Sequence, residues 1–92
     1  MRYKVQFTST FKRDISKAEK QNKDLNKIFN VIEKLANGEK LSRRFRDHQL
    51  SGEYKKAREC HIEPDWLLVY KINNNLLVLE LLRTGTHSEL FK

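Results

Sequence analysis

The chain has 92 residues, of which 38% are hydrophobic and 34% charged, and its formal net charge is +7. This length predicts one small domain over residues 1–92 with a single core. The longest strictly apolar run, Trp66–Tyr70, is far shorter than the ~20 residues that cross a bilayer. No apolar stretch follows Met1, and Cys60 is the only cysteine, so we expect a cytoplasmic protein without a signal peptide, disulfide or membrane contact.

The first half of the chain predicts one strand and two helices. Tyr3–Phe7 alternates apolar and polar residues, as a half-buried strand does. Thr8–Thr10 and Asp24 can cap the two helices, and Asn37-Gly38 can end the second. Apolar residues recur at helical spacing in both: Phe11, Ile15 and Ala18, then Leu25, Ile28, Phe29, Ile32 and Leu35.

The second half predicts three strands after a long polar connection. Residues 38–53 form this connection, and a connection of this length is often functional. The pattern predicts strands over Tyr54–Ile62, Trp66–Ile72 and Leu76–Leu82, with turns at Pro64-Asp65 and Asn73–Asn75.

The resulting element order, β-α-α-β-β-β, predicts an α+β fold. Counting chain reversals makes the first strand antiparallel to the second, and the last three strands form a meander. Both helices have an apolar stripe to bury. We therefore expect two helices packed on one face of a small antiparallel sheet.

The positive charge is concentrated in one half of the chain. Residues 1–46 contain thirteen basic and five acidic residues, a net charge of +8, whereas residues 47–92 have a net charge of −1. Such a surface fits a polyanion such as nucleic acid, because neutralised phosphates release counterions. An acidic protein partner would satisfy the same charge, and a basic surface that serves only solubility is a third explanation.

Several chemically versatile residues are predicted to meet at one end of the sheet. In a meander the second and fourth strands end at the same side, where the third strand begins. The residues that this places together are His61, Asp65, Trp66, Arg83 and His87. His48, in the long connection, could reach the same place.

Such a set fits RNA cleavage without a metal. This reaction needs a base for the 2′-hydroxyl proton, an acid for the leaving 5′-oxygen and a cation for the phosphate charge. Histidine, with an unperturbed pKa of about 6.5, suits either proton role. Arginine suits the phosphate, and an aromatic ring can stack on an unpaired base.

Each of these residues also has a purely structural explanation. A histidine at a strand end is commonly an ordinary surface residue, and Pro64-Asp65 is a common turn pair. Trp66 could be part of the core, and Arg83 could pair with a carboxylate such as Glu89. The predicted convergence favours the functional explanation.

The sequence predicts neither a metal nor a cofactor. Cys60 and His61 are neighbours on a strand and point to opposite faces, and no C-x-x-C or H-E-x-x-H spacing occurs. Gly38, Gly52 and Gly85 stand singly, so no phosphate-binding glycine loop is present. Cys60 is best explained as a small buried hydrophobe.

Three segments resemble one family of bacterial toxins. They are Asp47–Gly52, Arg58–Tyr70 and Arg83–Phe91, and they resemble the YafQ branch of the RelE/ParE superfamily. Length and element order extend the resemblance over essentially the whole chain, although the helical half shares only its pattern and basic character. The resemblance implies a RelE/ParE-like fold and the toxin of a type II toxin–antitoxin pair.

The matching positions imply roles for particular residues. Those implied in acid–base and electrostatic catalysis are His48, His61, Asp65 and His87. Arg83 would hold the scissile phosphate, and Trp66 and Phe91 would shape the site or contact bases. Gln49 stands where the family usually has Pro, which could loosen the loop that carries His48.

The implied activity is a metal-independent endoribonuclease that cuts mRNA in the ribosomal A site. His87 is expected to be the acid and His61 or Asp65 the base. The expected products are a 2′,3′-cyclic phosphate, or its opened 3′-phosphate, and a 5′-hydroxyl.

The implied partners are the ribosome, mRNA and a cognate antitoxin. The antitoxin would have an acidic C-terminal segment and a DNA-binding N-terminal part, so operator DNA would be reached only through it. Two alternatives stay open: a ParE-like, non-catalytic inhibitor of DNA gyrase, and an inert antitoxin-binding co-repressor. The clustered histidines favour the enzyme, because inhibition by binding needs no proton-transfer groups.

Overall fold

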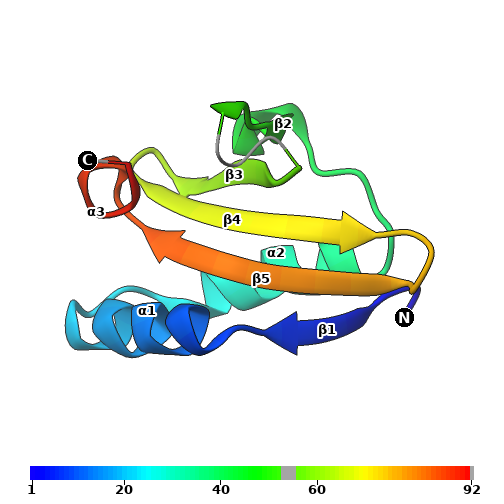
Figure 1. Ribbon diagram of the computed structural model, residues 1–92. Helices are drawn as coiled ribbons and strands as arrows, with labels where there is room; N and C mark the ends of the chain where they lie inside the picture. Colours follow the sequence, from blue (N-terminus) through cyan, green and yellow to red (C-terminus); the bar gives the residue numbers. More distant parts are fainter. Residues whose placement is uncertain (53–55, 92) are drawn as a thin grey trace.

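Two long helices follow the first strand, and the remaining strands form most of the sheet (Figure 1). The computed structural model describes residues 1–52 and 56–91. Its elements are, in chain order, β1 (Lys4–Phe7), α1 (Ser9–Lys20), α2 (Leu25–Ala36), the 3₁₀ turn η1 (Arg43–Phe45), β2 (His48–Gln49), β3 (Arg58–Glu63), β4 (Trp66–Asn73), β5 (Val78–Gly85) and α3 (His87–Leu90).

Both long helices begin where their capping residues predict. The Thr8 hydroxyl accepts a hydrogen bond from the backbone N–H of Phe11 at 3.0 Å. Asp24 accepts one from the N–H of Asn26, also at 3.0 Å. These side chains satisfy N–H groups that have no partner inside the helix, so the predicted helix starts are confirmed.

The sheet has the strand order β1-β5-β4-β3-β2, and β1 pairs with β5 in parallel. The predicted α+β class is confirmed, but the sheet is mixed rather than wholly antiparallel. β1 runs in the same direction as β3, so the prediction that the first two long strands are antiparallel was wrong. The prediction failed because it did not include β2, which lies within the connection expected to be irregular. β2 pairs antiparallel with β3 and so adds one reversal of chain direction between β1 and β3.

The last strand starts and ends later than predicted. Leu76 and Leu77 belong to the β4–β5 turn, because Asn73 Oδ1 accepts the N–H groups of Asn75 and Leu76 and holds the chain in a turn. β5 instead continues through Gly85. Arg83 therefore lies within the strand rather than after it. Of the predicted strand over Tyr54–Ile62, residues 54–55 lie outside the described residues, and Lys56 and Ala57 precede the strand. β3 runs from Arg58 to Glu63, one residue beyond the predicted end.

β4 is buried on both faces, which explains its uninterrupted apolar sequence. Trp66, Leu68 and Tyr70 pack with α1 and α2 in the main core. Leu67 and Val69 alternate with them and pack on the other face with Leu90 of α3. The two long helices thus share one face of the sheet, as predicted, and α3 contributes to the opposite face.

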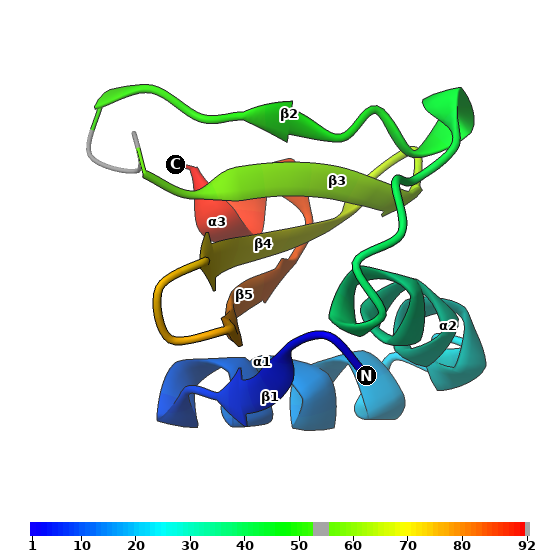
Figure 2. The ribbon, with the colours of Figure 1, turned by 90° about the vertical axis from the view of Figure 1, so that its right-hand side faces the viewer.

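The two edges of the sheet are β1 and β2. Figure 2 shows β2 along β3 at one edge of the sheet, with β1 at the other edge. In Figure 1, α3 lies at the end of the sheet where β5 ends and β4 begins. Among the described residues, no helix is long and apolar enough to cross a membrane.

Candidate active site

Three histidines from separate segments meet around one buried carboxylate. The His48 and His61 rings have centroids 6.4 Å apart, and the His61 and His87 rings have centroids 5.8 Å apart. Glu59 is only 4% exposed, and its Oε1 lies 3.5 Å from His48 Nε2 and 3.6 Å from His61 Nε2. Of the residues predicted to converge, His48, His61 and His87 meet here, and Asp65 joins them through its contact with His87. Trp66 and Arg83 line a different cavity, so the predicted convergence is wrong for these two residues.

The register of the strands explains why these side chains share one face. His48 lies opposite Glu59 in the β2–β3 pair, so the two side chains project from the same face. Glu59 and His61 are two residues apart on β3 and therefore also point to that face. His87 reaches them as the first residue of α3.

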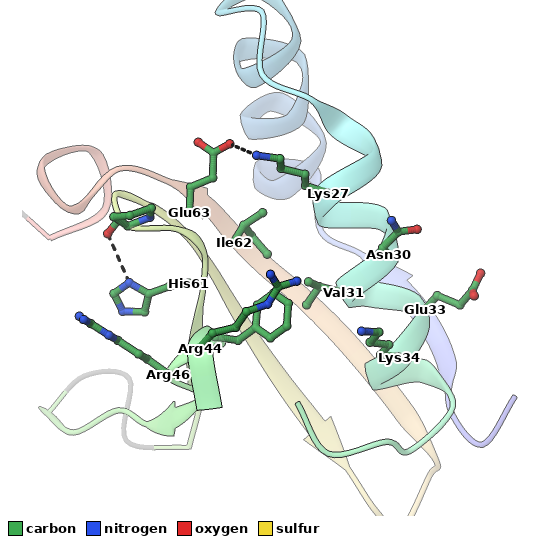
Figure 3. Close-up of a pocket in the computed structure, with 12 residues that line it drawn as sticks. Lys27, Asn30, Val31, Glu33, Lys34, Arg44, Arg46, His61, Ile62 and Glu63 are labelled. Atoms are coloured by element: carbon green, nitrogen blue, oxygen red, sulfur yellow. Dashed lines mark hydrogen bonds and ion pairs between the residues drawn. The ribbon is translucent and has the colours of Figure 1, made fainter. Parts of the chain in front are cut away.

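Each imidazole has an acceptor beside its Nδ1 atom. His48 Nδ1 donates to the carbonyl of Arg46 at 2.7 Å. His61 Nδ1 lies 3.4 Å from the carbonyl of Pro64, the contact drawn in Figure 3. Since a carbonyl only accepts, the proton of the neutral ring resides on Nδ1 and the Nε2 lone pair is available for chemistry.

Asp65 holds His87 in the same way. Its Oδ1 accepts the backbone N–H of His87 at 3.0 Å and lies 3.1 Å from His87 Nδ1. The backbone N–H of His87, together with its ring, lowers the pKa of the Asp65 carboxyl. Asp65 is therefore an ionised acceptor that orients His87, which makes it less suited to be the base.

Glu59 is the site residue that sequence reasoning missed. The i, i+2 spacing to His61 on a predicted strand was the available signal, but Glu59 was not considered as a neighbour of that histidine. One ligand atom each from Glu59, His61 and His87 lies within 4.8 Å of the others, a spacing at which the three could hold a metal ion. Nitrogen and carboxylate ligands of this kind suit Zn²⁺ or Cu²⁺.

The loop that carries His48 is tied to the sheet through its preceding residue. Asp47 Oδ1 accepts the Tyr70 hydroxyl at 2.6 Å and Arg58 Nε at 3.2 Å. Burial, with the hydrogen bond to Asp47, raises the pKa of Tyr70. The tyrosine stays protonated, and this partly buried hydrogen bond anchors the loop that carries His48.

Arg83 lies next to a carboxylate that was not foreseen. Its Nε donates to Asp14 Oδ2 at 2.8 Å and its Nη2 to Oδ1 at 3.3 Å. Asp14 also accepts the N–H of Thr84 at 3.1 Å. The structural explanation suggested by the sequence, that Arg83 pairs with a carboxylate such as Glu89, is confirmed in kind, and the carboxylate is Asp14. Glu89 itself pairs with Lys17 at 2.6 Å.

Arg83 lines a small cavity of about 160 Å³ that none of the histidines lines. Trp66 forms part of the same cavity but is fully buried, and its Nε1 donates to Thr84 Oγ1 at 2.9 Å. Of its two expected roles, contact with a base is excluded in this conformation and shaping the site remains. Phe91, which is 37% exposed, follows α3, and its N–H donates to the carbonyl of His87 at 2.8 Å.

A larger groove of about 510 Å³ begins at His61 and runs between α2 and η1 (Figure 3). The site therefore has one end where ionisable groups cluster, and a groove leads away from that end. An acid, a base and an arginine at such a place fit a phosphodiester substrate.

Comparison with known proteins gives the class that this fold and site define. The model of the family described as bacterial toxin of type II toxin–antitoxin system, YafQ, matches residues 3–92. The mRNA interferase toxin YafQ of Escherichia coli K12 is 39% identical over 88 residues, which cover 95% of this chain and 94% of that protein. The chain therefore belongs to the YafQ family of type II toxins.

Solved structures agree with this assignment. The crystal structure of YafQ from E. coli BL21(DE3) is 34% identical with a TM-score of 0.92, covering 98% of this chain and 99% of that one. The E. coli DinJ-YafQ toxin–antitoxin complex gives 34% identity and a TM-score of 0.90 with 100% of both chains covered. A metal-bound toxin from Helicobacter pylori is 38% identical with a TM-score of 0.91, covering 97% and 99%.

Proposed function

We propose that this toxin is a ribosome-dependent, metal-independent endoribonuclease that cleaves translated mRNA and thereby inhibits translation. The observation that carries the proposal is the meeting of His48, His61 and His87 around buried Glu59. The mRNA interferase name of the E. coli relative supports the same activity.

The geometry favours His61 as the base. Its Nδ1 faces the Pro64 carbonyl, and its Nε2 faces Glu59, which would stabilise the imidazolium formed when Nε2 accepts the 2′-hydroxyl proton. The 2′-oxygen then attacks the phosphorus, and the bond to the leaving 5′-oxygen breaks. The products are a 2′,3′-cyclic phosphate, which water can open to a 3′-phosphate, and a 5′-hydroxyl.

His87 is suited to be the acid. Asp65 accepts its Nδ1–H and would stabilise the doubly protonated ring, which then donates the Nε2 proton to the leaving 5′-oxygen. His48, near Glu59 on the other side, would stabilise negative charge on the phosphate when it is protonated. Phe91, whose N–H donates to the carbonyl of His87, would shape this end of the site, whereas Trp66 would shape the cavity that Arg83 lines.

Arg83 would bind the scissile phosphate in place of the Asp14 carboxylate, to which it donates hydrogen bonds in this structure. A phosphate and a carboxylate both present paired oxygens to a guanidinium, so the substrate would compete with Asp14 for the same donors. Arg83 thus reaches the phosphate only as that ion pair gives way.

The same set of groups supports the proposal of metal independence. Base, acid and cation are all supplied by side chains, and a metal at Glu59, His61 and His87 would take the lone pair that the base needs. We therefore expect chelators to leave cleavage unchanged. Added Zn²⁺ or Cu²⁺ should inhibit it, and loss of activity with a chelator would contradict metal independence.

The proposed partners are the ribosome, its mRNA and a cognate antitoxin with an acidic C-terminal segment and a DNA-binding N-terminal part. The toxin–antitoxin complex of the E. coli relative supports the proposal of an antitoxin partner. The +8 charge of residues 1–46 suits both RNA and an acidic antitoxin segment. Changing Lys12 or Lys20 to Glu should weaken these associations and reduce their salt dependence.

The decisive experiment is primer-extension mapping of an mRNA in a reconstituted translation reaction, with wild type and His87→Gln compared. Cuts should be in register with codons, require ribosomes and disappear in the variant. Wild-type cuts in free RNA would contradict ribosome dependence. Intact mRNA with the wild type would overturn the nuclease and favour a gyrase inhibitor or a co-repressor.

A further inference from the structure

The large groove between α2 and η1 has a basic lining that the proposed catalytic steps do not use. We call it the basic groove and define its charged lining as Lys27, Glu33, Lys34, Arg44, Arg46 and Glu63. Its apolar floor includes Val31, Phe45 and Ile62. His61 belongs both to the groove and to the histidine cluster, so the groove is continuous with the proposed reaction centre.

Most of the cations in the basic groove have no acidic partner among the residues that the structure describes. Glu63 pairs with Lys27 at 2.9 Å, as Figure 3 shows. None of the ion pairs found in residues 1–52 and 56–91 includes Lys34, Arg44 or Arg46. Three neighbouring positive charges repel one another, and an anionic ligand in the groove would relieve that repulsion.

Phe45 orders two of these cations at the groove. The ring is 7% exposed, and its centroid lies 4.6 Å from the Arg44 guanidinium carbon and 5.8 Å from Lys34 Nζ. These cation–π contacts restrict two long side chains before any ligand arrives, which lowers the entropy cost of binding. The guanidinium can still donate hydrogen bonds from its edge to a phosphate.

We infer that the basic groove holds the single-stranded RNA nucleotides next to the scissile phosphate, with Arg44 and Lys34 contacting their phosphates. This inference rests on the proposed nuclease function, because a substrate cut beside His61 must continue in one direction or the other from that point. A flat guanidinium beside an apolar floor also suits an unpaired base, which a carboxylate-rich peptide does not offer. RNA therefore fits the groove better than an acidic protein segment does.

The test measures binding of a fluorescein-labelled, 2′-O-methylated single-stranded RNA, which cannot be cleaved because its 2′-oxygens are blocked. Fluorescence anisotropy gives the Kd over a range of salt concentrations for the wild type, Arg44→Ala and Lys34→Ala. Lys4→Ala removes an exposed cation on β1, outside the groove, and is the matched control. Thermal unfolding of each variant checks that the fold is kept.

We expect each groove variant to weaken binding about fivefold or more, and to reduce the salt slope by about 0.7 for each phosphate that no longer meets a cation. Lys4→Ala should bind as the wild type does. Neutral methylphosphonate linkages, introduced one at a time, should weaken wild-type binding next to the blocked cut. In Arg44→Ala the same linkage should change the Kd little, because the arginine that contacts that phosphate is absent from this variant.

Groove variants that bind RNA like Lys4→Ala would overturn the inference. So would groove variants that lose affinity only for an octaglutamate peptide, which would identify an acidic segment as the occupant. The translation assay separates the two proposals. If the wild type cleaves mRNA but the groove variants bind RNA normally, only the groove inference fails. If the wild type does not cleave, the nuclease proposal fails whatever the binding data show.

Discussion

The two faces of β3 show how neighbouring residues can serve stability and chemistry separately. Cys60 points into the main core beneath the helices and is fully buried. Glu59 and His61, on either side of it, point to the opposite face and join the histidine cluster. Because side chains alternate along a strand, neighbouring residues of β3 belong in turn to the core and to the histidine cluster. Substitutions on the two faces should therefore affect different measurements.

The largest effect is expected for His61→Gln, on the histidine face. Loss of a general base should reduce cleavage about 10²–10⁴-fold, while the free energy of unfolding changes little. Cleavage rates in the translation reaction and urea unfolding provide the two readouts. Glu80→Gln, which removes a charge near the start of β5, is the control. Cleavage near the wild-type rate would remove His61 from the mechanism.

The opposite pattern is expected for Leu68→Ala, on the helix face of β4. Leu68 is fully buried, and its truncation should lower the free energy of unfolding by about 2–5 kcal/mol through reduced burial and a cavity. Cleavage per folded molecule should stay near the wild-type rate. Leu76→Ala is the matched control, because that side chain is 72% exposed and should change stability by less than about 0.5 kcal/mol. Equal losses of stability in the two variants would contradict this account of the core.

Local signals in the sequence were sufficient for the two long helices, for the three strands of the meander and for the histidines of the site. Thr8 and Asp24 cap the helices as predicted, because a capping bond depends on residues only two or three apart. The meeting of His61, Asp65 and His87 also followed from strand order, since the direction of the last three strands is fixed by short turns.

Long-range pairings were the part that local patterns could not specify. β2 has only two residues, too few for a periodic signal, and missing it reversed the predicted direction of β1. Arg83 pairs with Asp14, 69 positions earlier in the chain, because α1 lies against β5. Glu59 was overlooked for a different reason: a carboxylate on a strand is usually solvated, and its burial is evident only once the strand pairs are known.

A smaller effect is expected for Asp65→Asn, which tests how His87 is held on the histidine face. The amide has no charge to stabilise the protonated ring, so cleavage should fall about 10–100-fold. Stability should be nearly unchanged, since Asp65 is largely exposed. Cleavage rates in the translation reaction and urea unfolding are the two readouts. Cleavage at the wild-type rate by Asp65→Asn would contradict a role for this carboxylate in supporting His87.

The smallest effect is expected for Glu89→Gln, which sharpens the comparison by testing a carboxylate that supports α3 without taking part in chemistry. The ammonium of Lys17 and the N–H of Thr86 lower the pKa of Glu89 to about 2. A carboxyl whose folded-state pKa is depressed stabilises the fold above its unfolded-state pKa of about 4.3. That contribution, about 1 kcal/mol or less for a half-buried capping group at the surface, is lost as the pH falls from about 5 towards 2. Urea unfolding should therefore show the wild type losing its advantage over Glu89→Gln across that range, whereas Glu19→Gln on α1 should show no such convergence. A constant difference between the wild type and Glu89→Gln at all pH values would mean that the side-chain hydrogen bonds of Glu89, and not its charge, stabilise the start of α3.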